Sequence, residues 1–204
     1  MLVDALHAPG PADPAALDDF GRLVGAWQLD WKGMAPDGAW HRATGELHVG
    51  WVLDGRAVQD VWIVPGRGEP GAGVPPLAFH GTTVRFLHPD GDRWLSTWME
   101  PVNGRVRRFT GRPHGADVVL LSDDEQPWLR WRFTDVGPDS FTWSAETSRD
   151  GGRTWVHDAL MLARRLASPH ERREGRSSSC WTGPLDVCGW PLQGPAAAPS
   201  RAPP

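Results

Sequence analysis

The sequence predicts an all-β protein, an antiparallel meander closed into a barrel of about eight to ten strands behind one short helix. Between Ala26 and Leu166 the chain consists of short segments rich in Trp, Val, Phe and Thr. Asx-Gly pairs separate them, and such a pair is a strong hairpin signal because both central residues of a type I′ turn need positive φ. The pairs are Asp37-Gly38, Asp54-Gly55, Asp90-Gly91, Asn103-Gly104 and Asp150-Gly151. No helical segment between them is long enough to connect parallel strands. A meander of this length removes its unpaired edges by closing into a barrel.

The first element is a short amphipathic helix. Residues 1–13 are rich in Pro, Ala and Gly, and we expect them to be flexible. Asp13 and Pro14 are suited to the N-cap and the first helical position. Apolar residues then recur at helical spacing up to Gly25, namely Leu17, Phe20, Leu23 and Val24.

The strands that follow are expected to form one barrel domain over residues 14–167. Pro65–Pro76 is its one long loop. The G-x-G-x-x-G letters at Gly66 lie in this proline-broken loop and precede no helix, so they predict no dinucleotide site. Residues 168–204 are polar and rich in Pro, Ala and Arg, and we expect a disordered tail.

Composition limits the partners. The 204 residues carry a net charge of −4, and their basic residues are scattered, which argues against a nucleic-acid partner. No apolar run approaches the roughly 18 residues of a membrane span, and no signal peptide is evident, so we expect no membrane association and a cytoplasmic location. Cys180 and Cys188 have no zinc-site spacing, and neither a metal nor another cofactor is predicted. The oligomeric state is not indicated.

One motif suggests catalysis at first sight. SRDGGRTW, from Ser148 to Trp155, fits the S-x-D-x-G-x-T-W Asp box of sialidases and other propellers. Propellers repeat it in each blade, whereas here it occurs once, and no pair of catalytic carboxylates accompanies it. We therefore expect the side chains of Ser148 and Asp150 to stabilise a hairpin turn, with Trp155 packed beneath it.

Alternation along each strand predicts which side chains face the interior, because neighbouring side chains point to opposite faces of a sheet. The predicted inward set is Val58, Asp60 and Trp62 in strand 56–64; His80, Thr82, Val84 and Phe86 in 79–88; Trp94, Ser96, Trp98 and Glu100 in 93–100; Arg105, Arg107 and Phe109 in 105–110; Leu129, Trp131 and Phe133 in 128–134; Phe141, Trp143 and Ala145 in 141–147; and Trp155, His157, Ala159 and Met161 in the last strand. The opposite face, with Arg85, Arg130, Arg132 and Glu146, is expected to carry outer salt bridges. The alternative is a reversed parity that buries Glu146 with Arg130.

The interior set supplies the candidate site residues. Aromatic side chains with few polar ones favour binding of a small hydrophobic molecule, and the candidate ligand-binding residues are Trp62, Trp98, Arg107, Trp131 and Trp143. Core packing is the alternative explanation for the tryptophans, and an ion pair between Asp60 and Arg107 is the alternative for that arginine. The candidate acid–base residues are His80, His157 and Asp60.

The sequence resembles an uncharacterised bacterial family of calycin-like barrels, related to lipocalins and fatty-acid-binding proteins. The motifs that carry the resemblance are FGRLVGAWQLD, WVLDGRAVQDVWIVPG, FHGTTVRFLHPDGDRWLSTW, SAETSRDGGRTW and MLARR, from about Phe20 to Arg165. The resemblance implies a barrel floor closed by the Trp of a Gly-x-Trp signature, here Gly25-Ala26-Trp27. It implies no single activity, since such folds include carriers of lipids and haem as well as a few cofactor-free enzymes.

Three functions remain open at this point. The first is a barrel that binds a hydrophobic or aromatic molecule. The second is a cofactor-independent cyclase, isomerase or hydratase acting on a hydrophobic metabolite. The third is haem binding through a strand histidine, with His157 as the ligand.

Overall fold

The computed structural model describes residues 15–70, 78–123 and 127–167, together with Leu6, Gly10, Pro11 and Asp13. Most of the predicted flexible N-terminus and all of the predicted 168–204 tail, including both cysteines, lie outside the described residues.

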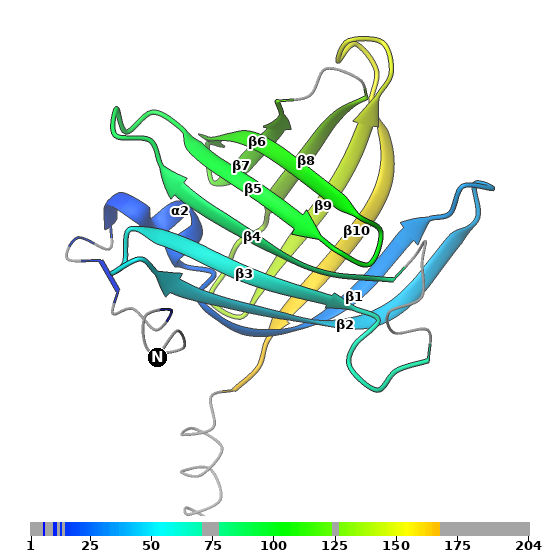
Figure 1. The fold of residues 1–204 in the computed structure, drawn as a ribbon, viewed down its shortest axis with the longest axis horizontal. Coiled ribbons are helices and arrows are strands. Elements are labelled where there is room, and N and C mark those ends of the chain that lie inside the picture. The colour runs from blue at the N-terminus through cyan, green and yellow to red at the C-terminus, as the bar shows by residue number, and fades with distance from the viewer. Residues whose placement is uncertain are drawn as a thin grey trace, which may run out of the picture. The chain divides into compact units, whose positions relative to one another are not determined.

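The described residues form a closed barrel of ten antiparallel strands, each paired with its neighbours in sequence, which confirms the predicted fold class (Figure 1). The strands are β1 (Gly25–Met34), β2 (Trp40–Val52), β3 (Ala57–Val64), β4 (Phe79–Leu87), β5 (Trp94–Glu100), β6 (Arg105–His114), β7 (Asp117–Ser122), β8 (Trp128–Thr134), β9 (Ser140–Ser148) and β10 (Val156–Arg165). Closure pairs β1 with β10, from Trp27 opposite Arg165 to Gly33 opposite Ala159. Among the ten strands that the structure describes, none therefore leaves an unpaired sheet edge.

The predicted turns connect adjacent strands. All five Asx-Gly pairs lie between consecutive strands, and the glycine of each pair has positive φ, from 66° at Gly104 to 86° at Gly38. The positions of the five turns are confirmed, but among their Asx residues only Asp54 also has positive φ, so the other four turns are not of type I′. The hairpin signal depends only on the local backbone, which is why it could be recognised in the sequence.

A short helical segment covers one end of the barrel (Figure 1). It consists of a 3₁₀ turn, η1 (Ala15–Leu17), and one α-helical turn, α2 (Asp18–Gly21), and is shorter than predicted. Asp13 begins it by accepting a hydrogen bond from Ala15 N (3.1 Å). Phe20 is fully buried below it and packs edge-on against Trp94 (4.9 Å between ring centroids) and Phe133 (5.4 Å). We call this end the floor.

Trp27 and Arg165 stabilise the floor through hydrogen bonds and a cation–π contact. Trp27 is fully buried and donates a hydrogen bond from Nε1 to the carbonyl of Leu23 (2.8 Å). The Arg165 guanidinium lies 4.0 Å from the centre of the Trp27 ring and donates to the carbonyls of Val24 (2.7 Å) and Arg22 (2.8 Å). The last strand therefore holds the helix against the first strand, and Trp27 closes the floor as the resemblance implies.

The opposite end, the mouth, carries the β1–β2 and β9–β10 hairpins (Figure 1). The Asp box forms the second hairpin. Ser148 Oγ donates to Asp150 Oδ1 (2.8 Å) and accepts from Gly152 N (2.8 Å). Hydrogen bonds from the Thr154 side chain and backbone, with further ones from Ser148 and Arg153, lower the pKa of Asp150 from 3.8 to about 2. The motif stabilises the turn, as predicted.

Candidate ligand-binding cavity

A cavity of about 570 Å³ lies inside the barrel on the side of the mouth. Its volume is typical of sites for small organic molecules, which occupy roughly 300–1,000 Å³. The aromatic side chains that line it come from strands all around the barrel: Trp31, Trp62, Phe79, Trp98, Trp131, Phe133 and Trp143. The four candidate ligand-binding tryptophans and Arg107 are therefore brought together at one cavity.

The aromatic wall is held by contacts among its own rings. Trp131 lies at its centre, with ring centroids 5.9 Å from Trp98, 5.4 Å from Trp143 and 4.1 Å from Phe109. Trp143 also contacts Trp62 at 5.7 Å. Edge-to-face and tilted pairs of this kind are favourable and leave few rotamers available to each ring. The cavity therefore has preformed walls.

The absence of a side chain at Gly81 makes room for the Trp98 ring. A Cβ atom on Gly81 would lie 2.5 Å from two carbons of the Trp98 ring and 2.7 Å from the Met99 carbonyl oxygen. Only a residue without a side chain lets the indole lie this close to β4.

Arginines line the mouth. Arg105, Arg107 and Arg149 contribute to the cavity lining there, and Arg107 donates a hydrogen bond to the Val106 carbonyl (2.9 Å). The nearby carboxylate of Glu100 is occupied by the turn between β5 and β6, where it accepts hydrogen bonds from the backbone of residues 102 and 103. An anionic group of a ligand could therefore be attracted to this end of the cavity.

A buried ion pair lies at the inner side of the cavity. Asp60 and Arg85 are each 1% exposed, and Asp60 Oδ2 lies 2.5 Å from Arg85 Nη1. Asp60 Oδ1 accepts a hydrogen bond from Thr83 N (2.9 Å). The guanidinium also faces the Phe20 ring at 4.5 Å. Asp60 is interior as predicted, but its partner is Arg85, so the ion pair with Arg107 that was the alternative explanation for that arginine is not formed.

The parity predicted for strand 79–88 is wrong. Gly81, Thr83 and Arg85 are buried, whereas the predicted inward residues lie on the other face, with His80 and Phe86 exposed and Thr82 and Val84 half-buried. Both faces of this strand carry apolar side chains, and the interior one also carries a charge, so hydrophobic alternation favoured the wrong face. His80 lies outside the cavity, and Arg85 is inside rather than on the outer face.

In the last strand the parity changes at a β-bulge. The register of β10 against β9 shifts between His157 and Ala159, so that Asp158 and Ala159 both line the cavity. His157 points outward with 60% of its side chain exposed, and Trp155 is outside as well, 4.1 Å from the Arg130 guanidinium. The prediction that His157 and Trp155 face the interior is therefore wrong, because an inserted residue reverses the alternation.

A second ion pair joins β8 to β9: Arg130 Nε lies 2.5 Å from Glu146 Oε2, and His157 Nε2 lies 3.4 Å from Glu146 Oε1. Burial raises the pKa of Glu146, but the hydrogen bond from Arg130 and the charges of Arg130, His157 and Arg132 offset this and leave its pKa below the ordinary value. The predicted pairing of Arg130 with Glu146 is present, but Glu146 is 5% exposed and contributes to the cavity lining, so the pair is not the solvent-exposed outer salt bridge that was expected.

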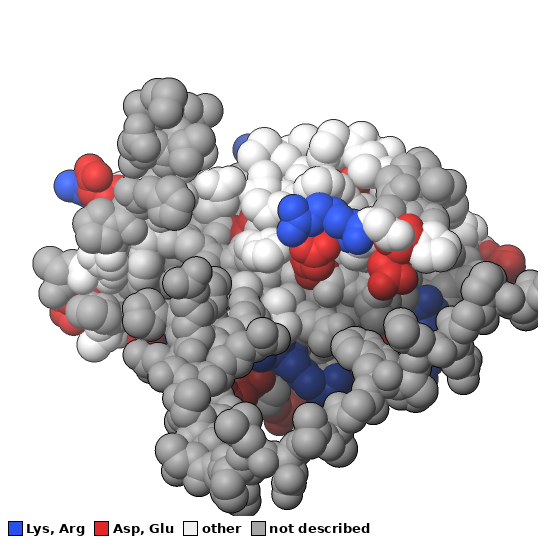
Figure 2. Space-filling model, turned by 90° about the horizontal axis from the view of Figure 1, so that it is seen from below, with Lys and Arg blue, Asp and Glu red and all other residues white. Residues whose placement is uncertain are grey.

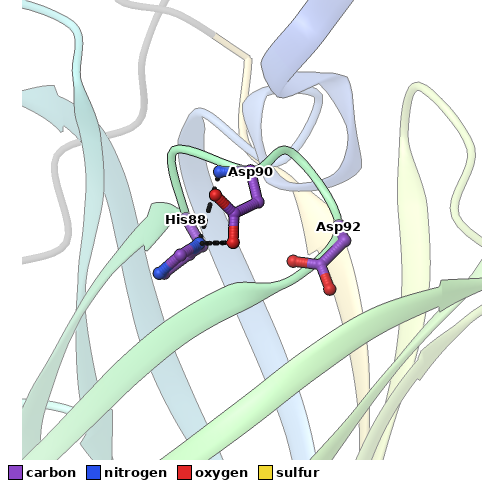
Figure 3. Close-up of side chains that lie close together, drawn as sticks. All are labelled: His88, Asp90 and Asp92. Atoms are coloured by element: carbon purple, nitrogen blue, oxygen red, sulfur yellow. Dashed lines mark hydrogen bonds and ion pairs between the residues drawn. The ribbon is translucent and has the colours of Figure 1, made fainter.

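Two polar clusters lie away from the cavity. His88, Asp90 and Asp92 gather in the exposed turn between β4 and β5 (Figure 3). Arg93 lies 2.6 Å from Asp92, and Arg112 lies 3.7 Å from it, so basic side chains already balance these carboxylates. We therefore regard the cluster as a set of surface ion pairs.

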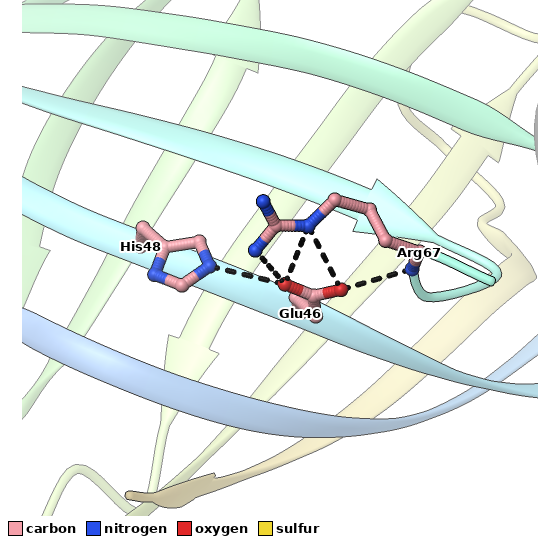
Figure 4. Close-up of polar contacts among 3 residues, drawn as sticks. All are labelled: Glu46, His48 and Arg67. Carbon is pink, nitrogen blue, oxygen red and sulfur yellow. Dashed lines mark hydrogen bonds and ion pairs between the residues drawn. The ribbon is translucent and has the colours of Figure 1, made fainter.

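The second cluster joins β2 to the segment after β3 (Figure 4). Glu46 accepts hydrogen bonds from Arg67 N (2.9 Å) and Nη2 (2.5 Å), and His48 Nε2 lies 3.3 Å from it. The hydrogen bonds from Arg67 lower the pKa of Glu46 from 4.5 to about 2. The cluster anchors the start of the long loop to the barrel.

Charges of both signs are mixed on the surface. On the face shown in Figure 2, the coloured basic and acidic side chains lie next to one another without a broad area of one sign. This agrees with the scattered basic residues of the sequence. Among the described residues there is no helix long and apolar enough to cross a membrane.

A closed antiparallel meander, with a helix over one end and an aromatic cavity toward the other, is a calycin-like β-barrel. The structure is similar to that of the S-type phycobiliprotein lyase CPES from Guillardia theta (TM-score 0.51, 14% identity, covering 74% of this chain and 93% of that one). It is also similar to Rv2717c from M. tuberculosis (TM-score 0.51, 12% identity, covering 75% of this chain and 98% of that one). No protein-family model matches the sequence. No curated protein matches it either. At these identities the likenesses show the fold alone.

Proposed function

We propose that this protein binds a small hydrophobic or aromatic molecule inside the barrel. The observation that carries the proposal is the cavity of about 570 Å³ with a preformed wall of tryptophans. Trp62, Trp98, Trp131 and Trp143 are the proposed contacts for the apolar part of the ligand, and Arg107 at the mouth is the proposed contact for an anionic group. We also propose that the protein belongs to the uncharacterised bacterial calycin-like family that its sequence motifs resemble.

The two alternative functions have less support. No histidine lines the cavity among the described residues, and His80 and His157 both lie on the outer side of the barrel wall. Asp60 is interior, but its carboxylate is engaged by Arg85 and Thr83 N. The residues considered from the sequence for acid–base chemistry and haem ligation are therefore not positioned to act on a molecule in the cavity, whereas the carboxylates that line it belong to Glu100, Glu146 and Asp158.

The first experiment is native mass spectrometry of the purified protein, compared with its denatured mass. A retained ligand adds mass that disappears on denaturation, and the released molecule identifies its class. A similar fold occurs in an enzyme, a phycobiliprotein lyase. A molecule that this protein binds only transiently would be lost during purification and would add no mass. For that reason a probe titration accompanies the measurement.

The probe is 8-anilinonaphthalene-1-sulfonate, whose fluorescence increases in apolar surroundings. Ala145 and Ala159 face each other across β9 and β10 and both line the cavity. We expect Ala145→Trp to fill the cavity and abolish probe binding. Thr142→Trp on the outer face of the same strand is the matched control and should bind as the wild type does. Undiminished binding by a folded Ala145→Trp variant would place the probe elsewhere and contradict the proposed site.

A further inference from the structure

Unpartnered polar atoms are concentrated at the inner side of the cavity. Among the described residues, six buried side-chain nitrogen or oxygen atoms have no hydrogen-bond partner, and four of them belong to three neighbouring residues. The four atoms are Nε and Nη1 of Arg85, Oγ1 of Thr83 and Oγ of Ser96, and of these Nη1 is ion-paired with Asp60 Oδ2. All three residues are at most 4% exposed. Buried polar groups are normally hydrogen-bonded, so a cluster without partners suggests that something else supplies them.

The strand register brings these atoms together. Asp60 on β3 is directly opposite Thr83 on β4, and Arg85 on β4 is directly opposite Ser96 on β5. Thr83 and Arg85 line the cavity. Trp98 is opposite Thr83 in the β4–β5 ladder and lies two pairs nearer the mouth than Ser96. Of the three residues, Thr83 and Arg85 line the inner end of the aromatic cavity, and Ser96 is buried next to Arg85.

The cluster offers hydrogen-bond donors. Arg85 Nε carries an N–H group without an acceptor, whereas Arg85 Nη1 is already paired with Asp60 Oδ2, and the hydroxyls of Thr83 and Ser96 can rotate to donate. The Asp60 carboxylate, 2.5 Å from Arg85 Nη1, already balances the guanidinium charge. A second anion in this buried place would face Asp60 without a cation of its own, which is unfavourable. The group that fits best is a neutral acceptor.

We propose that the cavity binds its ligand with a neutral carbonyl oxygen at the inner end, where Arg85, Thr83 and Ser96 donate hydrogen bonds to it. The aromatic body of the ligand then lies between Trp98 and Trp143. The ligand class is an aromatic or polycyclic ketone, quinone, lactone or amide. This inference rests on the proposed function, because it requires the cavity to be a ligand site.

Two probes of the same shape test it. 2-Acetylnaphthalene carries a carbonyl oxygen, and 2-isopropenylnaphthalene has a methylene group in its place. We expect the wild type to bind the ketone about tenfold more tightly, the effect of one good buried hydrogen bond. In the Thr83→Val/Ser96→Ala variant, which leaves the Asp60–Arg85 pair in place, the preference should fall to about threefold or less. Affinity for the alkene should stay unchanged.

The same variant should have a melting temperature at least as high as that of the wild type without ligand, because it removes two buried hydroxyls that lack partners. This readout shows that a loss of ketone binding does not come from unfolding. Ser140→Ala on the exposed end of β9 serves as the control and should leave the preference at about tenfold.

The outcomes separate the two proposals. Equal binding of both probes by the wild type would overturn the carbonyl site while leaving the cavity as a ligand site. The same conclusion follows if the double variant retains the full preference. Failure of both probes to bind, together with failure of the anilinonaphthalene probe, would overturn the proposed function itself.

Discussion

The Asp60–Arg85 pair allows a quantitative test of the buried cluster. Asp60→Asn removes the negative charge and keeps an oxygen that can accept the hydrogen bond from Thr83 N. Arg85→Met removes the positive charge and keeps an apolar chain of similar length against Phe20. Because both side chains are 1% exposed, each single substitution leaves the partner's charge buried without its counterion. We expect each to lower the free energy of unfolding by about 3–5 kcal/mol.

The double variant distinguishes this explanation from ordinary loss of packing. With both charges removed, the free energy of unfolding should return to within about 2 kcal/mol of the wild type, because apolar replacements of buried pairs are often neutral. The two singles should melt roughly 8–16 °C lower than the wild type. Urea unfolding followed by far-UV circular dichroism gives the four free energies. If the losses of unfolding free energy in the two single variants simply add in the double variant, with a coupling energy below about 1 kcal/mol, the buried ion pair is not the reason for those losses.

Three further substitutions test other features. Gly81→Ala should lower the free energy of unfolding by about 1–3 kcal/mol, since the new methyl group would overlap Trp98, and a urea midpoint equal to the wild type would contradict this. Arg107→Gln should weaken binding of anilinonaphthalene sulfonate by a few-fold at low ionic strength and less at high ionic strength, and an effect independent of salt would exclude charge as its cause. The lowered pKa of Glu46 means that its ion pair with Arg67 stabilises the fold fully above pH 4.5 and is lost as the pH falls through about 2. The stability difference between wild type and Glu46→Gln should therefore shrink over that range of pH, and a constant difference would show that the carboxylate charge is not involved.

Much of the fold could be predicted from the sequence because its signals are local. An Asx-Gly turn and the side-chain hydrogen bonds of Ser148 and Asp150 depend on a few consecutive residues. The helix was predicted longer than it is, since Leu23 and Val24 have helical spacing but pack at the floor after the helix has ended. Spacing alone does not determine where a chain leaves a helix to join a strand.

The site was predicted in part, and the errors have two physical origins. Trp62, Trp98, Trp131 and Trp143 were placed correctly because the large apolar residues of their strands share one face. Arg85 was missed because its burial depends on a carboxylate on another strand, which no single segment reveals.

His157 was misplaced because a bulge reverses the alternation without a distinctive residue to mark it. Trp31 and Phe79 were not identified as site residues, although Trp31 has the same parity as Trp27 and Leu29 on β1, a signal that could have found it.

The position of Arg165 has a consequence for how the chain acquires its structure. It donates hydrogen bonds to residues 22 and 24, and the partner at Val24 is 141 positions away in sequence. During synthesis, almost the whole barrel must therefore emerge from the ribosome before β1 can pair with β10. Until then β1 and β2 form a sheet with an open edge, to which a second nascent chain can add. Such long-range closure is slow, and a truncation a few residues before Arg165 should yield aggregates rather than a smaller folded protein.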